Sequence, residues 1–114
     1  MRLEGKVAFI SGGARGMGAV EAKMFASEGA KVAIGDVLEE EGQRLVEEIV
    51  QAGGQAMCLS LDVTSPTQGR KALAATTSRF GKLDVLVNNA GVGGQDVELK
   101  GLAGLNRLYA VEWQ

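Results

Sequence analysis

Four short apolar runs recur along the chain, and more polar stretches separate them. The runs cover residues 6–11, 31–36, 56–62 and 83–89 and lie roughly 25 residues apart, the spacing of repeated strand–helix units. They are rich in Val, Ile and Leu, and their apolar residues are nearly continuous rather than alternating. Strands that are covered on both faces have this pattern. The pattern therefore predicts four buried, parallel strands.

The stretches between the runs have the apolar spacing of helices. One helix is predicted over residues 16–28 and a second over 39–52, where apolar residues recur at intervals of three and four. A third is predicted to begin with Ser65 as its N-cap and Pro66 in its first turn, and to end before Gly81. The residues that mark the first helix are Met17, Val20, Met24 and Phe25.

The order of these elements is β-α-β-α-β-α-β. Because crossovers between parallel strands are right-handed, consecutive helices of such a chain cover the faces of one sheet. The expected fold class is therefore α/β, a Rossmann-like, doubly wound parallel sheet that is truncated to about four strands and three helices.

Composition and charge fit one globular domain and narrow its partners. The 114 residues are 46% apolar and 23% charged, with a net charge of −2 and no basic block, which argues against nucleic acid or an anionic membrane as a partner. No apolar run approaches the ~20 residues of a membrane span, and the first apolar run is too short for a signal peptide. A cytoplasmic location is expected.

The cysteine and histidine counts remove several kinds of chemistry. One cysteine, Cys58, and no histidine exclude a disulfide within the chain, a Cys/His zinc cluster and histidine-based acid–base catalysis. No metal site is expected. Cys58 lies inside an apolar run, so we interpret it as a small core residue rather than a reactive thiol.

Glycines gather where the first predicted strand gives way to the first predicted helix. The turn contains Gly12 and Gly16, with Gly18 following, and glycine there permits positive φ angles and a close approach to a ligand. The N–H groups of the helix that begins near Gly16 suit a diphosphate. The glycines alone fit a plain connecting turn equally well. Asp36 favours a ligand, because a carboxylate at the end of the second strand can accept hydrogen bonds from adenosine ribose hydroxyls.

The spacing of these motifs resembles that of the short-chain dehydrogenase/reductase family. The turn reads Ser11-Gly12-x-x-x-Gly16-x-Gly18, and "LDV" at 61–63 and "NNAG" at 88–91 stand where the family has its adenine-contacting and fourth-strand motifs. The resemblance covers residues 1–91 and implies a dinucleotide-binding half with strand order 3-2-1-4, followed by an irregular tail over 92–114. It also implies an oxidoreductase that moves a hydride between a nicotinamide and an alcohol or ketone carbon.

The resemblance implies a role for individual residues. The implied cofactor-binding set is Gly12, Arg15, Gly16, Met17, Gly18, Asp36, Asp62, Val63, Asn89, Ala90 and Gly91. The first five would shape and line the phosphate turn, and Asp36 would hold the adenine ribose. Asp62 and the Val63 backbone would contact the adenine, and residues 89–91 would approach the nicotinamide-side ribose, whereas Asn88 would brace the strands.

The same residues bear on the choice of cofactor. Asp36 would repel a 2′-phosphate, so NAD is expected in preference to NADP, although a basic residue such as Arg15 sometimes serves that phosphate in the family. The implied partners are thus a nicotinamide dinucleotide and, in a full-length relative, an alcohol or ketone substrate.

The catalytic residues of the family are not found in this sequence. Its chemistry requires a Tyr, a Lys four residues later that lowers the pKa of the Tyr, and a Ser that orients the carbonyl. The only tyrosine, Tyr109, is followed four residues later by Trp113, and no serine occurs after Ser78. We therefore expect no catalytic residue here and interpret Tyr109 as a packing residue.

Three interpretations stay open at this point. The favoured one is a truncated NAD-dependent dehydrogenase that holds the cofactor half and is inactive alone. The others are a non-catalytic nucleotide-binding protein and an unstable fragment with no function of its own. Because no fifth strand is expected, the fourth would have an open apolar edge, and self-association through residues 83–89 is expected unless the tail covers it.

Overall fold

The computed structural model describes residues 3–12, 16–62, 64–88 and 109–112, and the structural statements below concern these residues. The elements are β1 (Val7–Ser11), α1 (Gly16–Ser27), β2 (Lys31–Asp36), α2 (Glu39–Gln51), β3 (Gln55–Ser60), α3 (Pro66–Phe80), β4 (Val85–Asn88) and β5 (Tyr109–Glu112). The alternation from β1 to β4 confirms the predicted order of strands and helices.

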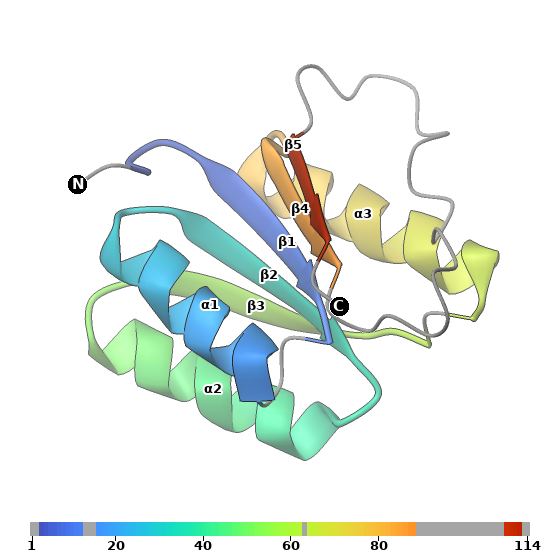
Figure 1. Cartoon of the computed structure of the whole chain (residues 1–114), viewed down its shortest axis with the longest axis horizontal. Helices are drawn as coiled ribbons and strands as arrows, with labels where there is room; N and C mark the ends of the chain where they lie inside the picture. Colours follow the sequence, from blue (N-terminus) through green and yellow to red (C-terminus); the bar gives the residue numbers. More distant parts are fainter. Residues whose placement is uncertain (1–2, 13–15, 63, 89–108, 113–114) are drawn as a thin grey trace.

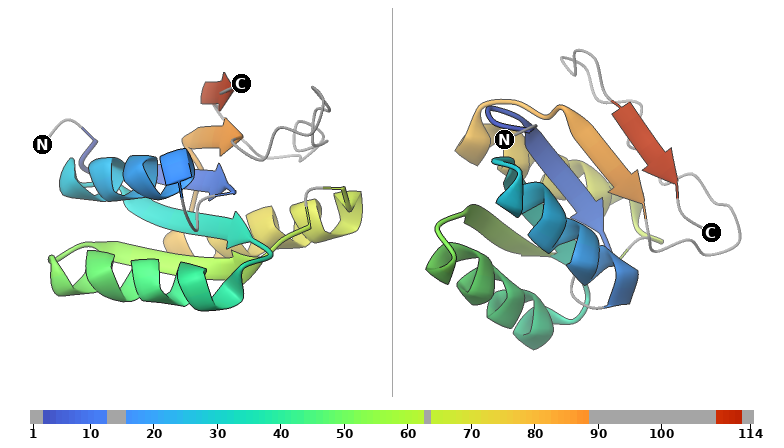
Figure 2. Two further views of the ribbon diagram at one scale, coloured as in Figure 1. Left: turned by 60° about the horizontal axis from the view of Figure 1, so that its bottom comes forward. Right: turned by 60° about the vertical axis from the view of Figure 1, so that its left-hand side comes forward.

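The strands form one sheet with the order β3-β2-β1-β4-β5, and every pairing is parallel. The predicted order 3-2-1-4 is therefore confirmed. Helices α1 and α2 cover one face of the sheet, and α3 covers the other (Figure 1). The two further views in Figure 2 show the same three layers from the side.

Each face of the sheet packs its own apolar core. Towards α3, Val7 and Phe9 of β1 pack with Leu73 of the helix, and all three are almost fully buried. Towards α1 and α2, Ile10 and Ile34 pack with residues of both helices. Burial on both faces explains why β1 and β2 read as continuous apolar runs rather than alternating ones. The prediction of a buried strand is wrong for β3, which lies at the edge of the sheet and is only partly buried.

Helix α1 exposes three of the four residues that marked it in the sequence, whereas the fourth, Phe25, is partly buried and packs against the core. Met17, Val20 and Met24 are 57%, 57% and 58% exposed, whereas Gly18 and Ala22 are buried against the sheet. Small residues on the inner face let the helix backbone lie close to the strands. The apolar spacing therefore located the helix correctly, although three of its four marker residues lie on the exposed face.

Helix α3 begins and ends with the predicted caps. The Ser65 hydroxyl oxygen accepts a hydrogen bond from the Gln68 N–H at 3.3 Å, and Pro66 occupies the first turn. Gly81 ends the helix with φ 87° and donates its N–H to the Thr77 carbonyl at 2.8 Å. These local signals fix the crossover that carries the chain from β3 to β4.

Strand β5 corrects the expectation of an irregular tail and meets the condition under which no self-association through β4 was expected. It lies within residues 92–114, which were expected to be irregular, and it pairs in parallel with the whole of β4, from Val85↔Tyr109 to Asn88↔Glu112. The edge of β4 is thus covered, because its free N–H and C=O groups find a partner strand, and self-association through an open β4 is not expected. The proposed domain boundary at residue 91 falls outside the described residues.

Neither a membrane span nor a metal cluster appears in the described part of the chain. None of the helices there is long and apolar enough to cross a bilayer. No group of three His, Cys, Asp or Glu side chains there could hold a metal ion.

Candidate cofactor-binding site

The carboxyl ends of the strands meet at one edge of the sheet. Ser11, the last residue of β1, is paired in register with Gly35 of β2 and with Asn88 of β4. The chain continues from β1 to β2 and β3 on one side, then crosses to β4 on the other (Figure 1). The strand order therefore reverses beside β1, and in open parallel sheets ligands bind beyond the carboxyl ends at this point.

The turn after β1 has the backbone that the glycines predicted. Gly12 and Gly16 adopt φ angles of 69° and 64°, a region that other residues rarely enter. The Gly12 N–H donates to the Gly35 carbonyl at 2.7 Å, which ties the start of the turn to β2. Among the described residues, a Cβ on Gly16 would have no atom within 4 Å, so nothing packs on this side of the residue. Gly16 thus begins a 12-residue helix, and helix N-termini in general attract anions.

Two other predicted residues lie in the first turn of α1. Gly18 is buried on the inner face, where it lets the helix approach the sheet, and Met17 is exposed beside the turn. Arg15 lies outside the described residues.

Asp36 ends β2 next to this turn. Its carboxylate is half-buried, and Oδ1 accepts the N–H of Leu38 at 3.1 Å. Its backbone carbonyl accepts the N–H of Leu61 at 3.1 Å, so the segment after β3 is held against the end of β2. Asp36 thus lies between the phosphate turn and the segment that carries Asp62.

Gly35, the residue before Asp36, was not among the predicted site residues. A Cβ at this position would lie 2.7 Å from both Phe9 Cζ and Leu61 Cδ2, so only glycine leaves room for these two buried side chains. An isolated glycine within an otherwise apolar strand was the signal that could have pointed to this close approach.

The surroundings of Asp36 are acidic. The first turn of α2 contains Glu39, Glu40 and Glu41, where negative charge interacts favourably with the helix dipole. Burial raises the pKa of the Cys58 thiol, and the negative charges of Asp36 and Glu39 raise it further. The thiol therefore stays protonated near neutral pH, in keeping with its interpretation as an unreactive residue. Its interpretation as a core residue is wrong, because Cys58 is only half-buried and lies in the edge strand β3.

Asp62 lies just after β3 and is exposed. Its Oδ1 accepts the side-chain hydroxyl of Thr64 at 2.6 Å and the backbone N–H of Thr64 at 2.9 Å. These hydrogen bonds lower the pKa of the Asp62 carboxyl, so it is ionised and can only accept hydrogen bonds. The Asp62 N–H donates to Gln68 Oε1 at 2.7 Å.

The structure thus brings together the phosphate turn, Asp36 and Asp62 along neighbouring strand ends. Val63 and residues 89–91, Asn89, Ala90 and Gly91, lie outside the described residues. The part of the site expected to meet the nicotinamide is therefore not described.

Comparison with known proteins identifies the family. A family model described as short chain dehydrogenase matches residues 6–112. The chain is 49% identical over 113 residues to a 2,5-dichloro-2,5-cyclohexadiene-1,4-diol dehydrogenase of Sphingobium indicum, covering 96% of this chain and 44% of the relative. It is 50% identical over 91 residues to a 3-alpha-(or 20-beta)-hydroxysteroid dehydrogenase of Mycobacterium tuberculosis, covering 80% of this chain and 34% of the relative.

Solved structures have the same arrangement of elements. A 7 alpha-hydroxysteroid dehydrogenase complexed with NADH and 7-oxo glycochenodeoxycholic acid superposes with a TM-score of 0.78 at 42% identity, covering 82% of this chain and 36% of that one. The chain thus spans less than half the length of these relatives. Since the family model matches almost the whole chain and the fold agrees, the chain belongs to the short-chain dehydrogenase family.

Proposed function

We propose that this chain is the NAD-binding portion of a short-chain dehydrogenase/reductase and that it is catalytically inactive on its own. One observation carries the proposal: the glycine turn, Asp36 and Asp62 lie side by side at the carboxyl ends of β1, β2 and β3. The Leu61 N–H donates a hydrogen bond to the Asp36 carbonyl at 3.1 Å, which joins the ends of β2 and β3.

Each group suits one part of the dinucleotide. The positive-φ glycines and the N-terminal N–H groups of α1 would hold the diphosphate. The Asp36 carboxylate would accept hydrogen bonds from the adenosine ribose hydroxyls, and Asp62 would accept one from the adenine amino group. When bound, the nicotinamide supplies or takes up the hydride.

The charge around Asp36 supports NAD over NADP. A 2′-phosphate would stand beside Asp36 and near the three glutamates that begin α2. Two like charges about 4 Å apart repel by about 1 kcal/mol in water and by more near a protein surface. Because about 1.4 kcal/mol corresponds to a factor of ten, we expect NAD to bind at least about tenfold more tightly.

The missing catalytic set supports the absence of turnover. An alcohol can lose a hydride only if a base takes its hydroxyl proton, and the Ser and Tyr-x-x-x-Lys set that does this in the family does not occur in the sequence. The same absence fits a nucleotide-binding protein without catalysis. The coding sequence downstream of Gln114 separates the two: a continuing frame with a Ser and Tyr-x-x-x-Lys supports the dehydrogenase.

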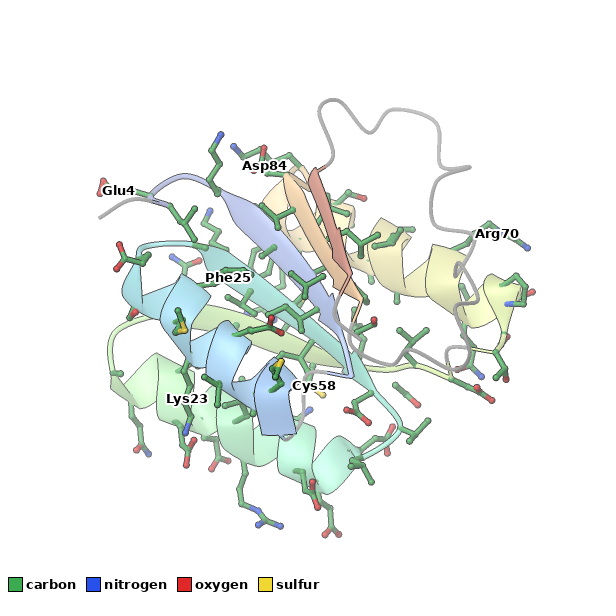
Figure 3. The ribbon with its side chains drawn as sticks, in the orientation of Figure 1. Glu4, Lys23, Phe25, Cys58, Arg70 and Asp84 are labelled. Atoms are coloured by element: carbon green, nitrogen blue, oxygen red, sulfur yellow. The ribbon has the colours of Figure 1, made fainter. Side chains whose placement is uncertain are left out.

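Calorimetric titration of the purified chain with NAD and NADP tests the cofactor assignment. We expect NAD to bind more tightly, and Asp36→Ala to narrow or reverse the difference. Glu4→Ala is the matched control, since it removes one negative charge at the opposite end of the sheet (Figure 3) and should leave the difference unchanged. Tighter binding of NADP by the unaltered chain would contradict the role of Asp36, and no binding of either would contradict the proposal.

Assays of alcohol oxidation and ketone reduction test the second part. We expect no turnover by the unaltered chain. Turnover that survives Tyr109→Phe would reveal an unrecognised proton donor, whereas turnover that this change abolishes would show that Tyr109 is catalytic.

A further inference from the structure

The side chain of Gln68 makes a connection that its position in α3 does not require. Ser65 and Gln68 are the N-cap and third residues of the helix, and in a capping box the side chain at the third position returns to the N–H of the N-cap. Here the Ser65 N–H instead donates to the Asp62 carbonyl at 2.9 Å. Gln68 Oε1 accepts the Asp62 N–H at 2.7 Å, six residues back along the chain.

These bonds hold the Asp62 backbone on both sides. Its N–H is fixed by Gln68 and its carbonyl by Ser65, both at the start of α3. The residue before it, Leu61, is 1% exposed and bonded to the end of β2. The position of Asp62 relative to Asp36 is therefore set by the helix as well as by the sheet.

The Asp62 carboxylate is held in one orientation. Both hydrogen bonds from Thr64 reach Oδ1, at 2.9 and 2.6 Å. Among the described residues no donor reaches Oδ2, and the side chain is exposed. Oδ1 thus already accepts two hydrogen bonds, which leaves Oδ2 as the oxygen that a ligand could use. An ionised carboxylate recognises only donors, such as the exocyclic amino group of adenine.

We propose that Gln68 is a positioning residue of the adenine site, which holds Asp62 so that its carboxylate selects a base with a 6-amino group. This inference rests on the proposed function, because it takes NAD as the ligand. Gln68 acts through Asp62 and touches no reacting atom. Gln68 holds the backbone of Asp62, and Thr64 orients its carboxylate.

The test compares NAD with nicotinamide hypoxanthine dinucleotide, in which an oxo group replaces the adenine 6-amino group. Calorimetry on the full chain should give about tenfold tighter binding of NAD, as expected for one hydrogen bond to a charged acceptor. In Gln68→Ala this ratio should fall towards one. Gln68→Glu retains an acceptor oxygen and should largely keep the ratio. Thr67→Ala, a change at a neighbouring exposed residue, should leave it unchanged.

Each outcome decides between the inference and the proposed function. A ratio that survives in Gln68→Ala, or a ratio near one in the unaltered chain, overturns the inference while NAD binding still stands. Failure of the unaltered chain to bind NAD overturns both. If Gln68→Ala does not fold, Thr64→Val replaces it, since it removes only the hydroxyl donor to Asp62. That variant should lower the ratio and raise the pKa of the Asp62 carboxyl by NMR titration, and no change in either refutes the inference.

Discussion

Replacing Asp84 with alanine should loosen the junction of β1 and β4. Asp84 Oδ2 accepts the Val7 N–H at 2.9 Å, and the Asp84 N–H donates to the Val7 carbonyl at 2.9 Å. Figure 3 shows Asp84 beside the amino ends of these two strands. Val7 is 1% exposed, so its largely buried N–H loses this acceptor when the carboxylate is removed.

The size of the effect follows from these contacts. Leaving a buried N–H without an acceptor costs about 1–3 kcal/mol. The ion pair from Lys82 Nζ to Asp84 Oδ2, at 3.1 Å, adds little, because the lysine side chain is 50% exposed and such pairs contribute about 0–1 kcal/mol. We therefore expect Asp84→Ala to lower the free energy of unfolding by about 2 kcal/mol, which is about 8 °C in Tm for a domain of this size.

Urea and thermal unfolding followed by circular dichroism measure this loss. Lys82→Ala is the matched control, because it removes the ion pair but keeps the hydrogen bond, and it should cost less than about 1 kcal/mol. Asp84→Asn keeps an acceptor oxygen and should fall between the two. An Asp84→Ala variant no less stable than Lys82→Ala would refute the assignment of the stability to the buried hydrogen bond.

Two further predictions concern the strand ends. Gly35→Ala would place a Cβ 2.7 Å from both Phe9 Cζ and Leu61 Cδ2. It should therefore lower the free energy of unfolding in urea by about 1–3 kcal/mol and weaken NAD binding by displacing Asp36. An unchanged midpoint of urea unfolding would show that this core can shift. Because burial and the charge of Asp36 raise the pKa of the Cys58 thiol, its alkylation by iodoacetamide at pH 8 should be slower than that of free cysteine. Asp36→Asn removes a negative charge, lowers that pKa and should speed the reaction, and an equal rate would mean that the carboxylate does not act on the thiol.

The sequence by itself determined the elements and the kind of site. Continuous apolar runs predicted the buried strands, and Ser65, Pro66 and Gly81 predicted both ends of α3, because capping depends on residues only a few positions apart. The glycine turn and Asp36 pointed to one edge of the sheet, because parallel strands all end on the same side. These features depend on local chemistry and on a strict rule of topology.

Only the tertiary structure decided which faces and edges are covered. Met17, Val20 and Met24 of α1 are exposed, because close packing on the sheet selects the small residues Gly18 and Ala22 instead. Strand β5 pairs with β4 although the connecting chain gives no local signal for it. The bond from Gln68 to Asp62 likewise depends on where helix α3 begins relative to the end of β3. In each case the deciding contact joins groups whose distance in space is set by the packing of whole elements, which no short stretch of sequence encodes.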